Sequence, residues 1–87
     1  MSEVDNTKAQ NGISLEDLNQ YTSTPLSIKE FNVLKELSQG LTNKEIGEKL
    51  NVSDHTIKWH SRHLYSKLGV KTRTAAAKFY RDISEQK

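Results

Sequence analysis

N-cap residues recur along this 87-residue chain, and each precedes apolar residues at helical spacing. This repeated pattern of helix starts constrains the fold more than any other feature. Ser27 precedes Glu30 by three residues, the spacing of a capping box, and Gly40 suits a left-handed C-cap. The pattern predicts a helix between these residues, with one apolar side formed by Val33, Leu34, Leu37 and Leu41.

A short helix is predicted next, over "NKEIGEKL", with Thr42 or Asn43 as its N-cap and Ile46 and Leu50 facing inward. Glycine inside a helix costs about 1 kcal/mol relative to alanine, so Gly47 indicates the close approach of another helix.

The connection that follows has the composition of a tight turn. Asn51 tolerates a left-handed conformation, Val52 is expected to plug the turn, and Ser53 can cap a further helix. Two helices joined by three or four residues, the first short and tightly packed, describe a helix-turn-helix.

The further helix is expected at about 53–68, ended by Gly69 with Val70 as the apolar contact behind it. At 100° per residue its sides separate cleanly. The inward side comprises Ile57, His60, Ser61, Leu64 and Leu68, and the outward side comprises His55, Trp59, Arg62 and Ser66, with Lys58 at the border.

A last helix is expected to open near Thr72 or Thr74, and its apolar stripe suits the core, a twin helix, or both. This stripe consists of Ala75, Ala76, Phe79, Tyr80 and Ile83. Ahead of these helices, "SLEDLNQY" predicts a short helix with Ser14 and Asp17 as a capping box. The expected fold class is therefore all-α: a four-helix helix-turn-helix domain over 25–87, after a flexible tail or linker at 1–24 that contains the short helix.

Charge is divided unevenly between the two parts of the chain. Residues 1–54 hold nine acidic and five basic side chains, a net charge of −4, whereas residues 55–87 hold two acidic and eight basic, a net charge of +6. The basic part is the candidate surface for a polyanion, although a charge run alone is more often a solvated face. The chain has no cysteine, no membrane-length apolar run and no signal-peptide layout, so a cytoplasmic protein is expected.

The stretch "PLSIKEFNVLKELSQGLTNKEIGEKLNVSDHTIKWHSRHLYSKLGVKTRTAAAK" resembles the C-terminal DNA-binding domain of LuxR-type (GerE-like) bacterial transcription regulators. The resemblance covers about residues 25–83 and rests on four pieces in order: "LSIKE", "GLTNKEI", "TIKWH" and "KLGVKTRTAA". The form "TIKWH…LY.KLGV" is most similar to the large MalT-like regulators.

The resemblance implies that the third of the four helices enters the major groove of DNA and that the fourth forms a homodimer. It also implies Arg73 as a partner for Glu30, although capping alone accounts for Glu30 equally well, and it marks Ser61 as a departure from a usually apolar position. Base-contacting positions fall on Lys58, Trp59 and Arg62; phosphate-contacting positions fall on Thr42, Asn43, Lys44, Ser53, Thr56, Lys67, Lys71 and Arg73; the expected dimer interface comprises Ala76, Phe79, Tyr80 and Ile83.

The chemistry of the outward side agrees with this role. Lys58 and Arg62 are four residues apart, so they can reach successive base pairs, and arginine can bond O6 and N7 of guanine together. Trp59 could press on a thymine methyl group or lie against the sugar-phosphate wall. The alternatives are that Trp59 packs against the "SLEDLNQY" segment and that the two cations are solvated surface charges.

Two other chemistries are disfavoured. His55, His60 and His63 have no carboxylate or thiolate to complete a metal site, so structural or phosphate-contacting roles are expected and neither metal nor cofactor is predicted. Ser53, Asp54 and His55 cannot align as a catalytic triad at a helix start, so no enzyme activity is predicted.

The sequence thus predicts a bacterial, nucleoid-associated transcription regulator. Its expected partners are double-stranded DNA with an inverted repeat of half-sites about 10 base pairs apart, a second copy of the chain, and RNA polymerase. The alternative is a protein-interaction module with the same fold, which uses Trp59 and the last helix to hold another regulator.

Overall fold

The computed structural model describes residues 13–86, so the expected tail at 1–12 lies outside the described residues. The described part is helical and contains no strand, which confirms the all-α prediction. None of its helices is long and apolar enough to cross a membrane. The helices are α2 (Leu15–Asn19), α3 (Ile28–Leu37), α4 (Asn43–Leu50), α5 (Asp54–Leu68) and α6 (Arg73–Gln86).

The helices begin where the sequence places their caps. The Ser27 hydroxyl accepts a hydrogen bond from the Glu30 N–H while the Glu30 carboxylate accepts one from the Ser27 N–H, a complete capping box. Thr42 caps α4 in the same way and Ser53 caps α5. Gly40 has the predicted left-handed conformation, φ +92°, but α3 ends earlier than predicted, at Leu37, with Ser38 as a right-handed C-cap.

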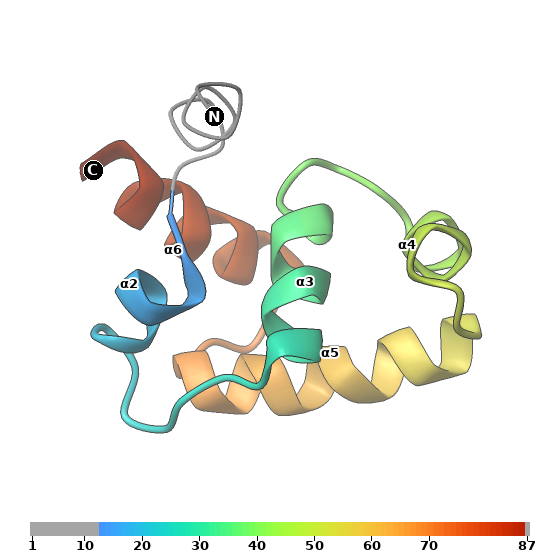
Figure 1. The fold of residues 1–87 in the computed structure, drawn as a ribbon, viewed down its shortest axis with the longest axis horizontal. Helices are drawn as coiled ribbons and strands as arrows, with labels where there is room; N and C mark the ends of the chain where they lie inside the picture. The colour runs from blue at the N-terminus through green and yellow to red at the C-terminus, as the bar shows by residue number, and fades with distance from the viewer. Residues whose placement is uncertain (1–12, 87) are drawn as a thin grey trace, which may run out of the picture.

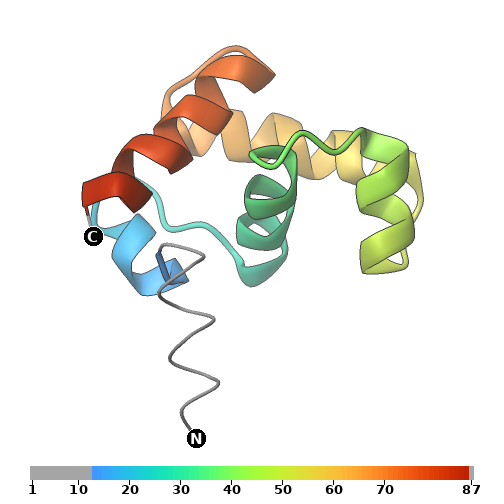
Figure 2. The same ribbon diagram turned by 90° about the horizontal axis from the view of Figure 1, so that it is seen from above.

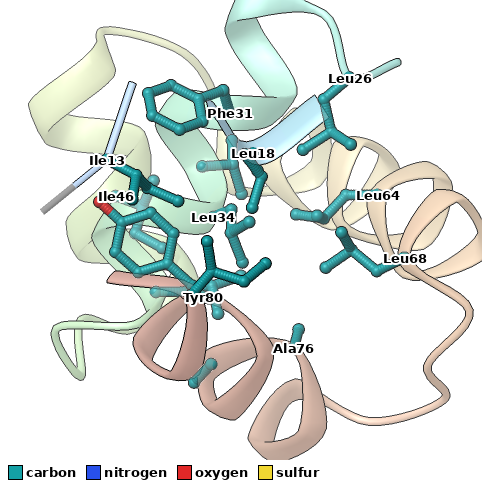
Figure 3. Close-up of a cluster of buried hydrophobic side chains, with 14 of the residues drawn as sticks. Ile13, Leu18, Leu26, Phe31, Leu34, Ile46, Leu64, Leu68, Ala76 and Tyr80 are labelled. Carbon is teal, nitrogen blue, oxygen red and sulfur yellow. The ribbon is translucent and has the colours of Figure 1, made fainter. Parts of the chain in front are cut away.

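α3 is the central element, and it packs against α4, α5 and α6. Figure 1 shows α3 standing across the long α5, and in Figures 1 and 2 α2 and α6 lie at one end of the molecule and α4 at the other. The interior is apolar, with Leu34 of α3, Ile46 of α4 and Leu64 of α5 completely buried (Figure 3). The arrangement leaves one side of α5 outside the core.

The segment before α3 is packed into the domain. Leu18 of α2 is completely buried, and Ile13 and Leu26 on either side of it are nearly so. They join the cluster that contains Phe31 and Tyr80 (Figure 3). The short helix is confirmed, and residues 13–24 are an anchored part of the fold where the sequence suggested a flexible linker.

The apolar stripe of α6 also turns toward the core. Ala76, Tyr80 and Ile83 are buried in the chain's own interior, and only Phe79 of the expected dimer set is half-buried. Because buried side chains cannot also contact a second copy, Ala76, Tyr80 and Ile83 are core residues in this structure. The expected four-residue dimer interface is to that extent wrong.

The turn between α4 and α5 forms by backbone contacts. Asn51 takes the predicted left-handed conformation, φ 64°, and the Val52 N–H donates to the Gly47 carbonyl at 2.8 Å. A Cβ atom on Gly47 would lie 2.6 Å from the Val52 carbonyl oxygen, so the close neighbour is this turn, where the sequence suggested another helix. Val52 was expected as a plug, but it is 36% exposed and lies at the edge of a groove of about 260 Å³.

Candidate nucleic-acid interface

The outward side of α5 is where periodicity predicted it. His55, Lys58, Trp59 and Arg62 are all exposed and line one shallow depression of about 190 Å³. The side chains of Lys58 and Arg62 start one helical turn apart, because residues four apart are neighbours on a helix surface. Trp59 stands between them with 57% of its surface exposed.

The Trp59 indole leans on its own helix. Its ring centroid lies 4.2 Å from that of His63 and 5.2 Å from that of His60. The high exposure contradicts the alternative in which Trp59 packs beneath the 14–21 segment. His63 was not predicted to support the indole, although the spacing of four residues between His63 and Trp59 could have indicated the contact.

Lys58 and Arg62 have no carboxylate partner among the residues that the structure describes. In contrast, Lys49 pairs with Glu36 at 3.0 Å and Lys78 pairs with Asp82 at 2.9 Å. An unpaired arginine retains all five N–H donors for an incoming acceptor. The exposed side of α5 therefore offers cationic donors that the fold does not itself use.

The N-termini of α4 and α5 are two further candidate contacts for an anion. The Thr42 hydroxyl accepts from the Glu45 N–H at the start of α4, and the Ser53 hydroxyl accepts from the Thr56 N–H at the start of α5. The Ser53 and Thr56 hydroxyls also share a hydrogen bond of 2.9 Å. Each terminus keeps further backbone N–H groups free for an anion, as first helical turns do.

Lys67 has a different partner from the one expected. Its Nζ atom donates to Oε1 of Glu30 at 2.7 Å, with only 8% of the Glu30 side chain exposed. The expected Glu30–Arg73 pair is therefore wrong. A phosphate contact by Lys67, which the resemblance implied, would require this ammonium to leave a buried carboxylate.

Opposing effects act on the Glu30 carboxyl. Burial raises its pKa, but the hydrogen bond and charge of Lys67, together with the hydrogen bonds of Ser27, outweigh burial and hold the pKa below the usual value. Glu30 is therefore a carboxylate at neutral pH, and it ties α5 to α3.

Arg73 is also engaged inside the domain. Its Nη1 atom donates to Oδ1 of Asn43 at 3.0 Å, and its Nη2 atom donates to the carbonyl oxygen of Leu41. The remaining expected phosphate contacts, Lys44 and Lys71, are exposed. Of the expected set, the structure thus leaves Lys44 and Lys71 free while it binds Lys67 and Arg73 to neighbouring helices.

A short helix, a tight left-handed turn and a second helix with an exposed basic side define a helix-turn-helix domain. Residues 24–80 match the sequence profile described as bacterial regulatory proteins, luxR family. The chain belongs to this family. The MalT-like subgroup stays a prediction.

Individual relatives share about half of their aligned residues with this chain. The nitrate/nitrite response regulator protein NarP of Escherichia coli is 51% identical over 51 residues, which are 59% of this chain and 24% of NarP. The transcriptional regulatory protein LnrK of Bacillus subtilis is 50% identical over 52 residues, 60% of this chain and 24% of LnrK. The HTH-type transcriptional regulator AlkS of Alcanivorax borkumensis is 42% identical over 55 residues, 63% of this chain and 6% of AlkS. The chain thus spans a quarter or less of these relatives.

Proposed function

We propose that this chain is the sequence-specific DNA-binding module of a bacterial transcription regulator, with α5 as the recognition helix. The observation that carries the proposal is the exposed side of α5, where Lys58 and Arg62 have no partner within the described residues and Trp59 lies between them. The major groove of B-DNA, about 12 Å wide, admits a helix with such side chains. The names of the relatives, all regulators, support the same function.

In this proposal base contacts and phosphate contacts come from different places. Lys58, Trp59 and Arg62 meet base edges, with Arg62 bonding guanine and the indole lying on a thymine methyl group or a sugar. The starts of α4 and α5 bind phosphates on either side and fix the position of the helix in the groove. The proposed phosphate-binding residues are Thr42, Asn43, Lys44, Ser53, Thr56 and Lys71.

A homodimer on an inverted repeat is part of the proposal, with α6 as the contact. Since Ala76, Tyr80 and Ile83 are in the core, the contact would use the outer side of α6 around half-buried Phe79. Sedimentation of the chain with a two-site and a one-site duplex tests this. Two chains on the two-site duplex with no cooperative gain would remove the dimer from the proposal. A cytoplasmic, nucleoid-associated location and a contact with RNA polymerase accompany this function.

The fluorescence of Trp59 tests DNA binding directly, because it is the sole tryptophan of the chain. We would titrate the protein with random-sequence duplex DNA at two salt concentrations. The expected result is a change in emission whose midpoint moves to higher DNA concentration at higher salt, since phosphate contacts release counterions. Emission indifferent to DNA, with no complex in a parallel gel-shift experiment, would favour the protein-interaction module instead.

A further inference from the structure

Arg73 opens α6, yet its guanidinium group contacts residues 30 and 32 positions earlier in the chain. Nη1 donates to the side chain of Asn43, the first residue of α4, and Nη2 donates to the Leu41 carbonyl in the loop that leads into α4. Leu41 and Asn43 flank Thr42, the N-cap. One side chain of α6 therefore holds both sides of the N-terminus of α4.

The chemistry of arginine suits this double contact. Its planar fork directs two N–H groups at two separate acceptors, a carbonyl oxygen and an amide oxygen, which a lysine ammonium cannot bind in the same fixed geometry. A helix N-terminus binds a phosphate only when its free N–H groups point at the anion. Without the fork, the loop carbonyl of Leu41 and the side chain of Asn43 would each lose a donor.

We propose that Arg73 is a positioning residue for DNA binding, which acts through Asn43 and the Leu41 carbonyl to hold the first turn of α4 against a phosphate. This inference rests on the proposed function. It differs from the role that the family resemblance implied, a direct phosphate contact. Lys71 lies two residues earlier, is exposed, and is proposed to contact a phosphate directly, so it serves as the comparison for Arg73.

The two roles predict different results for Arg73→Lys. A direct charge contact survives this change, because lysine keeps the positive charge. A positioning role does not, because the fork is lost. We expect Arg73→Lys to bind random-sequence duplex about fivefold to tenfold more weakly than the unaltered chain, with the same dependence on salt, since no charge has been removed. Unchanged affinity would overturn the proposal.

A double-mutant cycle makes the test sharper. If Arg73 acts through Asn43, then Asn43→Ala weakens binding, and Arg73→Lys added to it weakens binding by less than it does in the unaltered chain, because one of the two contacts of Arg73 is already lost while the contact to the Leu41 carbonyl remains. If the two side chains bind phosphates independently, the two fold-losses multiply, which would overturn the positioning role. Lys71→Met is the control. It should lower the slope of log affinity against log salt by about one unit, and its fold-loss in affinity should multiply with the fold-loss caused by Asn43→Ala.

A readout without DNA separates this inference from the proposed function. Backbone amides at the start of α4 should exchange hydrogen faster in Arg73→Lys and in Asn43→Ala than in the unaltered chain or in Lys71→Met, at equal urea midpoints. Unchanged exchange overturns the positioning role even where DNA binds. If the unaltered chain fails to bind duplex DNA, the proposed function falls and this inference falls with it.

Discussion

The Lys67 ammonium in α5 and the Glu30 carboxylate in α3 lie 2.7 Å apart and form an ion pair that is largely withdrawn from solvent. Glu30 uses the same side chain to cap its own helix at Ser27. One carboxylate thus caps the start of α3 and ties α5 to α3. In the proposed function this ion pair helps to hold the recognition helix on the rest of the domain.

Lys67→Met should destabilise the domain, because it leaves the Glu30 carboxylate buried without a cation and with only its hydrogen bonds to Ser27. We expect a loss of about 1–3 kcal/mol in the free energy of unfolding, measured with urea at pH 7. Lys78→Met is the matched control, since its pair with Asp82 is exposed and within one helix, and its loss should stay below about 0.5 kcal/mol. Equal losses in the two variants would remove the special role of the Glu30–Lys67 pair.

Stability should also depend on pH through Glu30. The pKa of Glu30 is lower in the folded chain than its usual value of 4.5, so its contribution is fully present above about pH 4.5 and is lost as the pH falls through the lower folded pKa. Urea unfolding of the unaltered chain and of Glu30→Gln, repeated between pH 7 and pH 3, measures this contribution as the difference between the two curves. The difference should shrink toward acid, and a constant difference would contradict the assignment.

Ser61→Ala should stabilise the domain. The Ser61 hydroxyl is buried and has no hydrogen-bond partner in the described structure, at a position that the family resemblance marked as usually apolar. Removal of an unsatisfied buried hydroxyl should raise the free energy of unfolding by about 1–2 kcal/mol. Ser66→Ala, at an exposed position of the same helix, is the control for helix propensity alone and should raise the free energy of unfolding by about 0.5 kcal/mol. The increase for Ser61→Ala should be larger.

Arg62→Ala should relax the choice of base at one position of the binding site. The proposed bidentate contact to guanine discriminates by about 1–3 kcal/mol, so preference at that position should fall while preference elsewhere stays. Binding to a pool of randomised duplexes, sequenced before and after selection, measures this for each position. An equal loss on all sequences would place Arg62 on the phosphate backbone.

The helices and their faces could be predicted from the sequence because both depend on local rules. Capping hydroxyls fix where a helix starts, and periodicity separates buried Ile57 and Leu64 from exposed Trp59. Three of the four helices after residue 25 have predicted N-caps that the structure confirms: Ser27, Thr42 and Ser53.

The partners of long cationic side chains could not be predicted in this way. Periodicity places the Cα atoms of Lys67 and Arg73 on a helix. Their charged groups lie several bonds from the backbone and can reach several acceptors on other helices, so the sequence does not specify which acceptor each one binds. The buried stripe of α6 was ambiguous for a related reason: the Tyr80 ring packs near Phe31 of α3, 49 residues earlier, and a local pattern cannot predict a contact over that separation.

The buried Leu18 carries a consequence for the extent of the folding unit. The family profile begins matching at residue 24, so a fragment cut there keeps every element of the helix-turn-helix and discards Ile13 and Leu18. Such a fragment would expose apolar surface of the cluster that contains Phe31 and Tyr80 to water, and an exposed hydrophobic patch promotes aggregation. We therefore expect the smallest cooperatively folding unit of this chain to begin before residue 24, where the family match starts.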